Sequence, residues 1–323
     1  MSLIPVDGLE VRVLIDNVTD SLSSTPPGVE TEFTHVARRG LRPASGRNLA
    51  CAVHGLSLML NARRGSLAHT LLFDTGPEEF ALERNATRLG APLTSVEGIV
   101  LSHGHWDHCG GVLGALNLAQ KEPGRRLPVY VHPEMFRTRA RPLPNGALSV
   151  MDDVPSVKTL QANGAEVISI REPQTLLDGM FYLSGVVPRV TDFEPGVPGQ
   201  VRSTDDGNWE RDELMPDERW LAVNVADKGL VVVSGCSHAG IINVLKHAQA
   251  TFAGIPIHAI VGGLHLSGPS EAYIEPTVKS LRHFNLKSIA AAHCTGWRAV
   301  GALANAFGDG VVAPSAVGKR YNY

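Results

Sequence analysis

The 323-residue chain lacks the features of several specialised protein classes. No apolar run approaches the roughly 18 residues that a membrane-spanning helix needs, and residues 1–10 lack the basic and then apolar pattern of a secretory signal. Charge of one sign is not in excess either, because 29 lysines and arginines face 32 aspartates and glutamates. Binding to nucleic acid or to an anionic membrane is therefore not expected. These absences predict a soluble, cytoplasmic protein.

Paired cysteines are missing as well, since none of the four cysteines belongs to a CxxC pair. They are Cys51, Cys109, Cys236 and Cys294. Their wide separation predicts neither a disulfide framework nor a zinc ribbon. A GxSxG turn, which would carry a serine nucleophile, is also absent. What the chain does contain is 43% hydrophobic and 19% charged residues, which is enough apolar material for a large buried core.

Short β-rich runs alternate with helical stretches, and this alternation predicts an α/β layered fold. Pro77–Leu89 has typical helix signals, with proline at its start, acids in the first turn and Gly90 as the stop. The other predicted helices are Gly111–Gln120, Ser156–Asn163, Ile241–Phe252, a stretch within Glu271–Phe284, and Arg298–Phe307. The predicted strands are Glu10–Asp16, Leu56–Leu60, Thr70–Phe73, Val96–Leu101, Pro128–Val131, Glu166–Ile170, Leu230–Val233, Ile257–Val261 and Ser288–Ala292.

Two segments depart from the alternation within residues 1–323, which we interpret as a single domain. Thr191–Arg219 is rich in glycine, proline and acidic residues and has little periodicity, so it predicts a long loop insert. Such a loop is either a cover over a functional site or a solvated surface excursion, and Trp209 and the adjoining Trp220 favour a cover. Arg38–Arg47 is basic and contains glycine and proline.

The strongest functional signal follows the predicted strand Val96–Leu101. Three imidazoles and a carboxylate occupy six consecutive positions there, as His103, His105, Asp107 and His108. These nitrogen and oxygen donors suit zinc, manganese or iron. In an extended loop the first two histidines point the same way, and the next two donors can turn toward a second ion. The segment therefore predicts a metal site.

Three later strands also run into a histidine at their carboxyl ends. These histidines are His238, His265 and His293. In layered α/β folds, ligands bind where the carboxyl ends of strands and their loops converge. We therefore expect His238 and His293 to join the metal site, and His265 either to join it or to donate a proton beside it.

The pattern His103-x-His105-x-Asp107-His108, with the sequence LFDTG at 72–76 upstream, resembles the metallo-β-lactamase superfamily. Five further segments resemble its dihydropterin ribofuranosyl-aminobenzene phosphate synthase-like branch. They are Val53–Ser57, Ser184–Arg189, Ser234–Gly240, Gly262–His265 and His293–Gly296. The resemblance covers nearly the whole chain from about Glu10. It implies a four-layer αβ/βα sandwich, two metal ions between the sheets and, usually, hydrolysis.

One departure from the superfamily pattern concerns Cys236. Many superfamily hydrolases carry a metal-bridging aspartate at this point, after the strand that here ends at Ser234-Gly235. Either Cys236 is a thiolate ligand, or His238 takes the place of the aspartate, or the ions are held less symmetrically. We favour His238, and the remaining interpretation of Cys236 is a buried cysteine that binds nothing.

Four further groups have a less specific signal. Asp74, at a strand end, resembles the carboxylate that orients a metal ligand in this family, although it can also cap a loop. His54 either faces the site or closes a turn. Arg189 and the Arg38–Arg47 segment are candidates to receive an anionic substrate group, because guanidinium groups suit phosphate and carboxylate.

These residues predict a binuclear metallo-hydrolase. His103, His105 and His238 are expected to hold one ion, and the other is expected at the ligands Asp107, His108 and His293. We expect zinc, with manganese or iron as alternatives. Hydroxide bound to the ions attacks the substrate in this scheme, with Asp107 orienting the water and His265 donating a proton.

The expected substrate is a small-molecule ester. Phosphoesters come first, carboxylic esters, lactones and β-lactams second, and a promiscuous enzyme is compatible with both. A mononuclear iron oxygenase acting on thiols is the alternative enzyme class, and a metal-stabilised small-molecule sensor is the alternative without catalysis. Nothing in the sequence predicts an oligomeric state.

Overall fold

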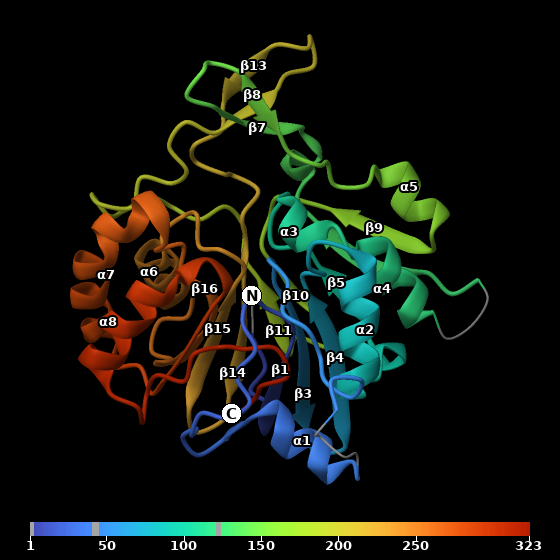
Figure 1. Ribbon diagram of the computed structural model, residues 1–323, viewed down its shortest axis with the longest axis vertical. Coiled ribbons are helices and arrows are strands. Elements are labelled where there is room, and N and C mark those ends of the chain that lie inside the picture. Colours follow the sequence, from blue (N-terminus) through green and yellow to red (C-terminus); the bar gives the residue numbers. More distant parts are fainter. Residues whose placement is uncertain (1–2, 41–44, 121–123) are drawn as a thin grey trace.

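Two β-sheets pack face to face in the computed structural model, which describes residues 3–40, 45–120 and 124–323. Helices cover the outer face of each sheet, so the main body has four layers (Figure 1). A smaller third sheet projects from one end of this body, at the top of Figure 1. The predicted αβ/βα sandwich is therefore present, with an additional sheet that the sequence did not indicate.

The first sheet has eight strands. In spatial order they are β2 (Val29–Glu30), β18 (Arg320–Asn322), β1 (Gly8–Ile15), β3 (Ser57–Arg64), β4 (Leu67–Phe73), β5 (Gly98–Val100), β6 (Leu127–Val131) and β9 (Ala165–Ser169). β4, β5, β6 and β9 are parallel, and the remaining pairs are antiparallel. On this side of the molecule lie the helices α1 (Glu32–Arg38), α2 (Glu79–Leu89), α3 (Trp106–Cys109), α4 (Val112–Ala119) and α5 (Val157–Ala162).

The second sheet has six strands. In spatial order they are β10 (Gln174–Leu176), β11 (Phe181–Leu183), β14 (Trp220–Val225), β15 (Gly229–Ser234), β16 (Ile257–Gly263) and β17 (Ser288–Ala292). The last three are parallel, and their outer face is covered by α6 (Ile241–Thr251), α7 (Ile274–Leu281) and α8 (Trp297–Phe307). Short 3-10 helices are found at Leu93–Ser95, Pro133–Phe136, Gly268–Tyr273, Arg282–Phe284 and His293–Thr295.

Alternating side chains build the layers. On β3, Leu58 and Leu60 face the second sheet, and Met59 between them faces the helices. This is the period of two that a strand with both faces buried requires. The inner faces of both sheets meet in one apolar core, to which Val223 and Val233 contribute from the second sheet. The resulting rigid body fixes where the strand ends lie.

The third sheet has four antiparallel strands, and we call this sheet together with the residues that directly flank its strands the arm. They are β13 (Trp209–Arg211), β12 (Val201–Ser203), β7 (Arg139–Pro142) and β8 (Leu148–Val150). β12 and β13 lie inside Thr191–Arg219, which the sequence predicted to be a loop. The sequence did not predict these strands, because each has only three residues and because β12 pairs with β7, which lies some sixty residues earlier in the chain.

Several local predictions are confirmed, with small shifts at the ends. The predicted hairpin is β3 and β4, and α2 ends at Gly90, whose φ of 58° is the left-handed conformation that favours glycine. The cap at the start of α2 is Glu78 rather than proline, because its carboxylate accepts hydrogen bonds from two backbone N–H groups. The fully buried strand β14 was missed. In the described part of the chain, no helix is long and apolar enough to cross a membrane.

Candidate metal centre

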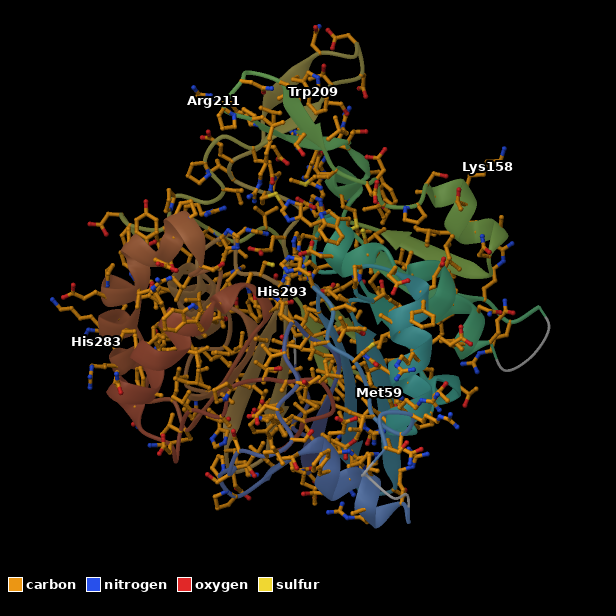
Figure 2. The ribbon with its side chains drawn as sticks, viewed as in Figure 1. Met59, Lys158, Trp209, Arg211, His283 and His293 are labelled. Carbon is orange, nitrogen blue, oxygen red and sulfur yellow. The ribbon has the colours of Figure 1, made fainter. Side chains whose placement is uncertain are left out.

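The candidate metal centre lies at the carboxyl ends of strands from both main sheets. His103 and His105 follow β5, Cys236 and His238 follow β15, and His293 follows β17. Figure 2 shows His293 at the middle of the molecule, between the two sheets and below the arm. The two sheets therefore bring together residues from distant parts of the chain, as the superfamily resemblance implied.

The backbone at the centre adopts a rare conformation at several positions. Positive φ angles occur at Asp74 (58°), Ser237 (59°), His265 (47°) and His293 (48°). Residues other than glycine adopt such angles at a cost, and the surrounding structure must hold them there. Their concentration at these strand ends indicates that the directions of the side chains are under functional constraint.

His103, His105 and His238 form the first group, which we call the three-imidazole set. The Nε2 atoms of His103 and His238 lie 3.1 and 3.2 Å from Nδ1 of His105. All three rings are buried. Burial lowers the pKa of each imidazole, that of His105 to about 3, so the rings are uncharged at neutral pH. Three converging neutral nitrogens can share a cation.

The outer edges of these rings are held by other side chains. Nε2 of His105 donates to Oε1 of Gln200 at 2.9 Å. Oγ of Ser102 donates to Asp74 and therefore accepts from Nδ1 of His103, at 2.9 Å. Each outer hydrogen bond leaves the inner nitrogen with a free lone pair, which is the usual arrangement behind a metal-binding histidine. In contrast, Nδ1 of His238 is buried and has no partner among the described residues.

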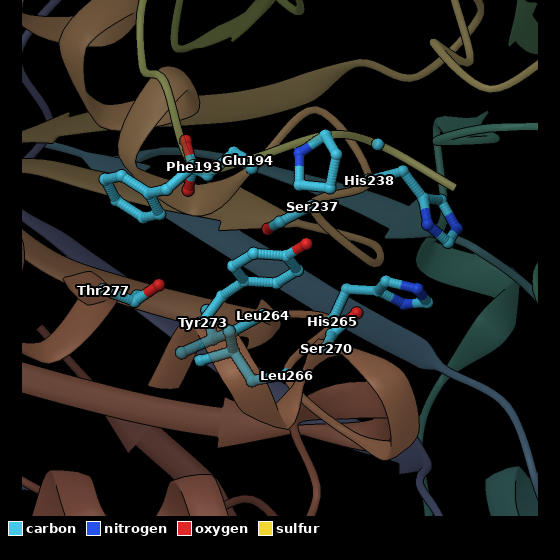
Figure 3. A pocket seen from close by; sticks show the side chains of 13 residues that line it. Phe193, Glu194, Ser237, His238, Leu264, His265, Leu266, Ser270, Tyr273 and Thr277 are labelled. Carbon is cyan, nitrogen blue, oxygen red and sulfur yellow. The ribbon is translucent and has the colours of Figure 1, made fainter. Parts of the chain in front are cut away.

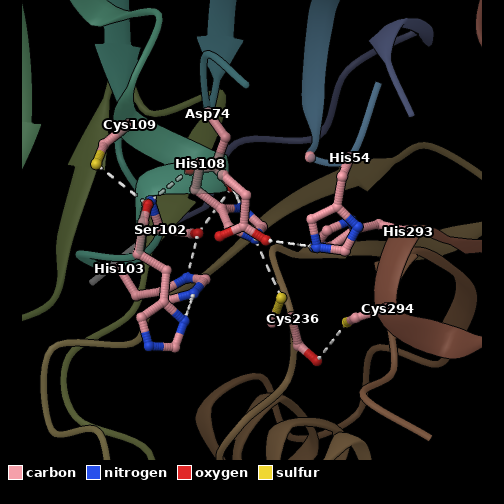
Figure 4. Close-up of polar contacts among 12 residues, drawn as sticks. His54, Asp74, Ser102, His103, His108, Cys109, Cys236, His293 and Cys294 are labelled. Carbon is pink, nitrogen blue, oxygen red and sulfur yellow. Dashed lines mark hydrogen bonds and ion pairs between the residues drawn. The ribbon is translucent and has the colours of Figure 1, made fainter. Parts of the chain in front are cut away.

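We call the other three predicted ligands, Asp107, His108 and His293, the carboxylate set. Asp107 and His293 offer donor atoms within 4.8 Å of one another together with His54, and His108 does so with His103 and Cys236. Oδ2 of Asp107 lies 3.2 Å from Nε2 of His293 and 4.0 Å from Nε2 of His108. His54 approaches the same oxygen to 3.4 Å. The outer nitrogens are again occupied, because Nδ1 of His108 donates to Asp74 at 2.7 Å and Nδ1 of His293 donates to Asn17 at 2.9 Å. Figure 4 shows these contacts around Asp74 and His108.

The charge of the carboxylate set is balanced within the protein. Burial opposes a charge on His108, but Asp74 and Asp107 outweigh it and raise the pKa of this imidazole to about 9. Burial also opposes the charge of Asp107, but His108 and His293 outweigh it and hold the pKa of this carboxyl far below its usual range. In the absence of metal, His108 therefore carries the proton that a cation would replace.

Two cysteines adjoin the carboxylate set. Sγ of Cys236 lies 3.1 Å from Nε2 of His108, and the Cys294 thiol donates to the backbone oxygen of Cys236 at 3.5 Å (Figure 4). Cys236, Cys294 and His265 each offer a donor atom within 4.8 Å of the others. Cys236 is therefore in reach of the centre, as one of the alternatives for this position required, and His238 is in reach as well.

A cleft of about 450 Å³ opens onto both sets of donors. Its lining comes from both main sheets and from the arm, and consists of Asn17, His54, His105, Trp106, Asp107, Arg141, Met151, Cys236, His238, His265, Ser267, His293, Cys294 and Gly296. A volume of this size suits a small-molecule ligand.

A second, much smaller pocket of about 30 Å³ lies beside the cleft. Its walls include the apolar side chains of Phe193, Leu264 and Tyr273, while His238 and His265 lie together at one end (Figure 3). Both histidines also line the large cleft, so they separate the two spaces. Nδ1 of His265 is buried without a partner among the described residues.

The structure brings all six predicted metal ligands together, and Asp74, Cys236, His54 and His265 lie against them. Arg189 contacts them only through the backbone of His238, and its assignment as a substrate-binding candidate stays a prediction. Its guanidinium donates to the backbone oxygen of His238 at 3.1 Å and to that of Leu214, and it does not line the cleft. It is therefore occupied in holding the loop that carries His238.

The basic segment Arg38–Arg47 does not line the cleft either. Arg38 pairs with Glu30 at 2.7 Å, and Arg39 donates to the backbone oxygen of Arg88. Residues 41–44 of this segment lie outside the described residues. Arg38 and Arg39 therefore have local structural partners.

Sequence reasoning missed several residues that support or line the site, among them Asn17, Gln200 and Arg141. Asn17 directly follows the strand predicted at Glu10–Asp16, so its place at a strand end was a usable signal. Gln200 and Arg141 belong to the arm, whose strands were not predicted, and no local pattern pointed to them. Only the position of the arm over the strand ends brings these two residues to the site.

Comparison with known proteins identifies the family. A family model described as the metallo-beta-lactamase superfamily matches residues 67–215. The 7,8-dihydropterin-6-methyl-4-(beta-D-ribofuranosyl)-aminobenzene-5'-phosphate synthase of Methanocaldococcus jannaschii is 30% identical over 247 residues, which are 76% of this chain and 82% of that protein. The chain belongs to the metallo-β-lactamase superfamily. An uncharacterized protein of the same organism is 29% identical over 249 residues, 77% of this chain and 86% of that protein.

Solved structures of the superfamily share the fold. The crystal structure of Tm1679, described as a metal-dependent hydrolase of the β-lactamase superfamily, matches with a TM-score of 0.70 and 23% identity, over 97% of this chain and 98% of that one. The metallo-beta-lactamase fold protein YhfI from Bacillus subtilis matches with a TM-score of 0.52 and 13% identity, over 98% and 99% of the two chains. These matches confirm the predicted fold class.

The superfamily fold implies divalent metal ions, and the residues present fit them. The donors of the three-imidazole set are uncharged nitrogens whose outer edges are already bonded, except at His238. The carboxylate set adds a negative oxygen and two more imidazoles. Catalytic zinc sites use imidazole and carboxylate ligands and keep one coordination position open. Structural zinc sites are instead closed by four protein ligands, often thiolates.

Proposed function

We propose that the protein is a hydrolase that uses two divalent metal ions to cleave an ester-type substrate, with phosphoesters as the first candidates. The observation that carries the proposal is that two members of each set, His105 and His238 of one and Asp107 and His293 of the other, line one cleft of small-molecule size. Zinc is the ion that we expect, with manganese or iron as alternatives. Carboxylic esters, lactones and β-lactams are the second group of substrates.

The residues of the centre have distinct tasks in this proposal. When bound, the ions lower the pKa of water and stabilise negative charge that develops on the substrate. His103, His105 and His238 hold one ion, and the ligands of the other are Asp107, His108 and His293. The free oxygen of Asp107 orients the attacking water.

Proton transfer to the leaving group is assigned to His265, because this histidine lines the cleft beside the predicted ligands. Burial opposes its protonation, but Cys294 and Glu218 outweigh burial and raise its pKa, so a proton is available near neutral pH. His54 touches Asp107 from the mouth of the cleft and helps to hold the orientation of that carboxylate.

A second candidate function is favoured by the 30% identity to a synthase whose named product carries a phosphate group. In that case the same centre would activate a phosphate-bearing compound for bond formation rather than for hydrolysis. Product analysis separates the two, because hydrolysis consumes one water for each ester cleaved.

Metal analysis followed by a substrate panel tests the proposal. We expect about two zinc or manganese ions per chain, and turnover of at least one phosphate, phosphonate or carboxyl ester that disappears after chelation and returns on adding zinc. One iron per chain would instead indicate a thiol oxygenase, and bound metal without turnover a sensor. Hydrolysis that survives complete removal of metal would contradict the proposal.

A further inference from the structure

We propose that Arg141 forms an anion-binding subsite in the cleft, and that the substrate carries a carboxylate- or phosphate-type group apart from the ester bond that is cut. The inference rests on the proposed hydrolase function and names the class of substrate. The arm contributes Arg141 and Met151 to the lining of a cleft whose other walls come from the main body of the protein.

The direction of Arg141 follows from the pleat of β7. Arg139 and Arg141 are two residues apart on this strand, so their side chains leave the same face. Arg139 is buried and donates to the backbone oxygen of Gly104 at 3.3 Å, between the first two predicted metal ligands. Arg141, two residues farther along β7 on the same face, lines the cleft.

The base of the arm holds this geometry firmly. Arg139 is bonded to Asp212 and to Asp217, each at 2.7 Å, and all three side chains are buried. Asp217 also accepts a hydrogen bond from the backbone N–H of Gly104 at 2.8 Å. The arm is therefore tied to the loop that carries His103, and the position of Arg141 relative to the metal centre is set by a buried ion-pair network.

Arg141 itself has no ion pair and no side-chain hydrogen bond among the described residues, and its side chain is exposed. On the same sheet, Arg202 is paired with Glu134 and Glu210. Asp107, the carboxylate that lines the cleft, is already engaged by histidines. The cleft thus contains one guanidinium whose charge no side chain of the described protein balances.

An unbalanced guanidinium in a ligand-sized cleft suits a planar or tetrahedral oxyanion, because its N–H groups can form two parallel hydrogen bonds to carboxylate or phosphate. Met151 and Trp106 line the same cleft and offer apolar contact to the part of a substrate between its two ends. Anchoring the remote anion would position the ester at the metal centre and reduce the entropy cost of reaction.

The test uses the metal-loaded protein and two 4-nitrophenyl esters of equal length, one ending in a carboxylate and one in a methyl group. We expect the Arg141→Gln variant to raise KM for the anionic ester by roughly tenfold to a hundredfold, the usual effect of losing a charge-assisted hydrogen bond. KM for the neutral ester should stay within about twofold of the wild-type value. The matched control is Arg137→Gln, since Arg137 is paired with Asp205 and does not line the cleft.

Binding of uncleavable anilide analogues that end in a carboxylate, a phosphonate or a methyl group provides a second readout by calorimetry. Weaker binding of one or both anionic analogues to Arg141→Gln, with the methyl analogue unchanged, supports the subsite and shows which oxyanion it prefers. Equal binding of all three analogues by wild type and variant would overturn it. If neither ester is hydrolysed but the calorimetric difference is present, the proposed hydrolysis fails while the subsite stands.

Discussion

The three-imidazole set and the carboxylate set lie next to each other at one cleft, yet the first consists of neutral side chains and the second contains charged ones. His103, His105 and His238 are kept neutral by burial, and no carboxylate belongs to their set. In the carboxylate set, His108 is kept charged by Asp74 and Asp107. A bound cation therefore adds positive charge to the first set, whereas in the second set it replaces the proton of His108.

Asp74 connects the two sets. Its Oδ2 accepts hydrogen bonds from Nδ1 of His108 and from Oγ of Ser102, and Ser102 in turn accepts from His103. Because Ser102 separates Asp74 from His103, the negative charge acts directly on one set and through a hydroxyl on the other. Burial and the nearby charge of His108 lower the pKa of His103 and keep this ring neutral, whereas Asp74 and Asp107 raise the pKa of His108 and favour its proton.

The largest expected effect comes from removing one ligand of each set. His105→Ala and Asp107→Ala should each lose about one of two metal equivalents and lower turnover by roughly a thousandfold, because each ion contributes several kcal/mol to the transition state. Metal analysis and ester hydrolysis measure both quantities. The control is His283→Ala, an exposed histidine far from the centre in Figure 2. Full metal content together with full turnover in either ligand variant would refute the two-set assignment.

A smaller effect is expected from the side chains that hold the outer ring nitrogens. Gln200→Met should weaken metal binding only at the three-imidazole set, and Asn17→Leu only at the carboxylate set, each by roughly tenfold to a hundredfold. Competition titrations with a chelating dye give the two dissociation constants. If both variants weakened both sites equally, the sets would not be independent and the comparison would fail.

The smallest measurable effect is the number of protons released on metal loading. At pH 7 the carboxylate set should release about one proton more than the three-imidazole set. His108, with its pKa of about 9, is protonated there, whereas the imidazoles of the other set have lowered pKa values. Above pH 9 this release should fade, since His108 has then lost its proton before the metal arrives. The readout is calorimetry in buffers of different ionisation enthalpy.

Each set can be titrated alone in the variant that has lost the other. His105→Ala retains the carboxylate set, and Asp107→Ala retains the three-imidazole set. Equal proton release from the two variants at pH 7 would contradict the charge difference drawn from the buried environments of His108 and His105.

Much of the fold was predictable because its signals are local. Alternation along β1, β3 and β4, and the glycine at the end of α2, depend on neighbouring residues and were interpreted correctly. The arm was not predictable, because its strands have three or four residues each and acquire their order from pairing between distant segments. β14 was missed although all of its residues are buried.

The sequence alone determined which donors this protein possesses and that they follow strand ends: the spacing of His103, His105, Asp107 and His108, and the later histidines after β15 and β17. Only the tertiary structure decided how they are grouped and charged. The two sheets bring His238 to His105 and His293 to Asp107, and the arm adds Gln200 and Arg141 from segments without any motif. The physical reason is that donor type and spacing are local properties, whereas burial, charge balance and hydrogen-bond partners depend on every element that packs around the site.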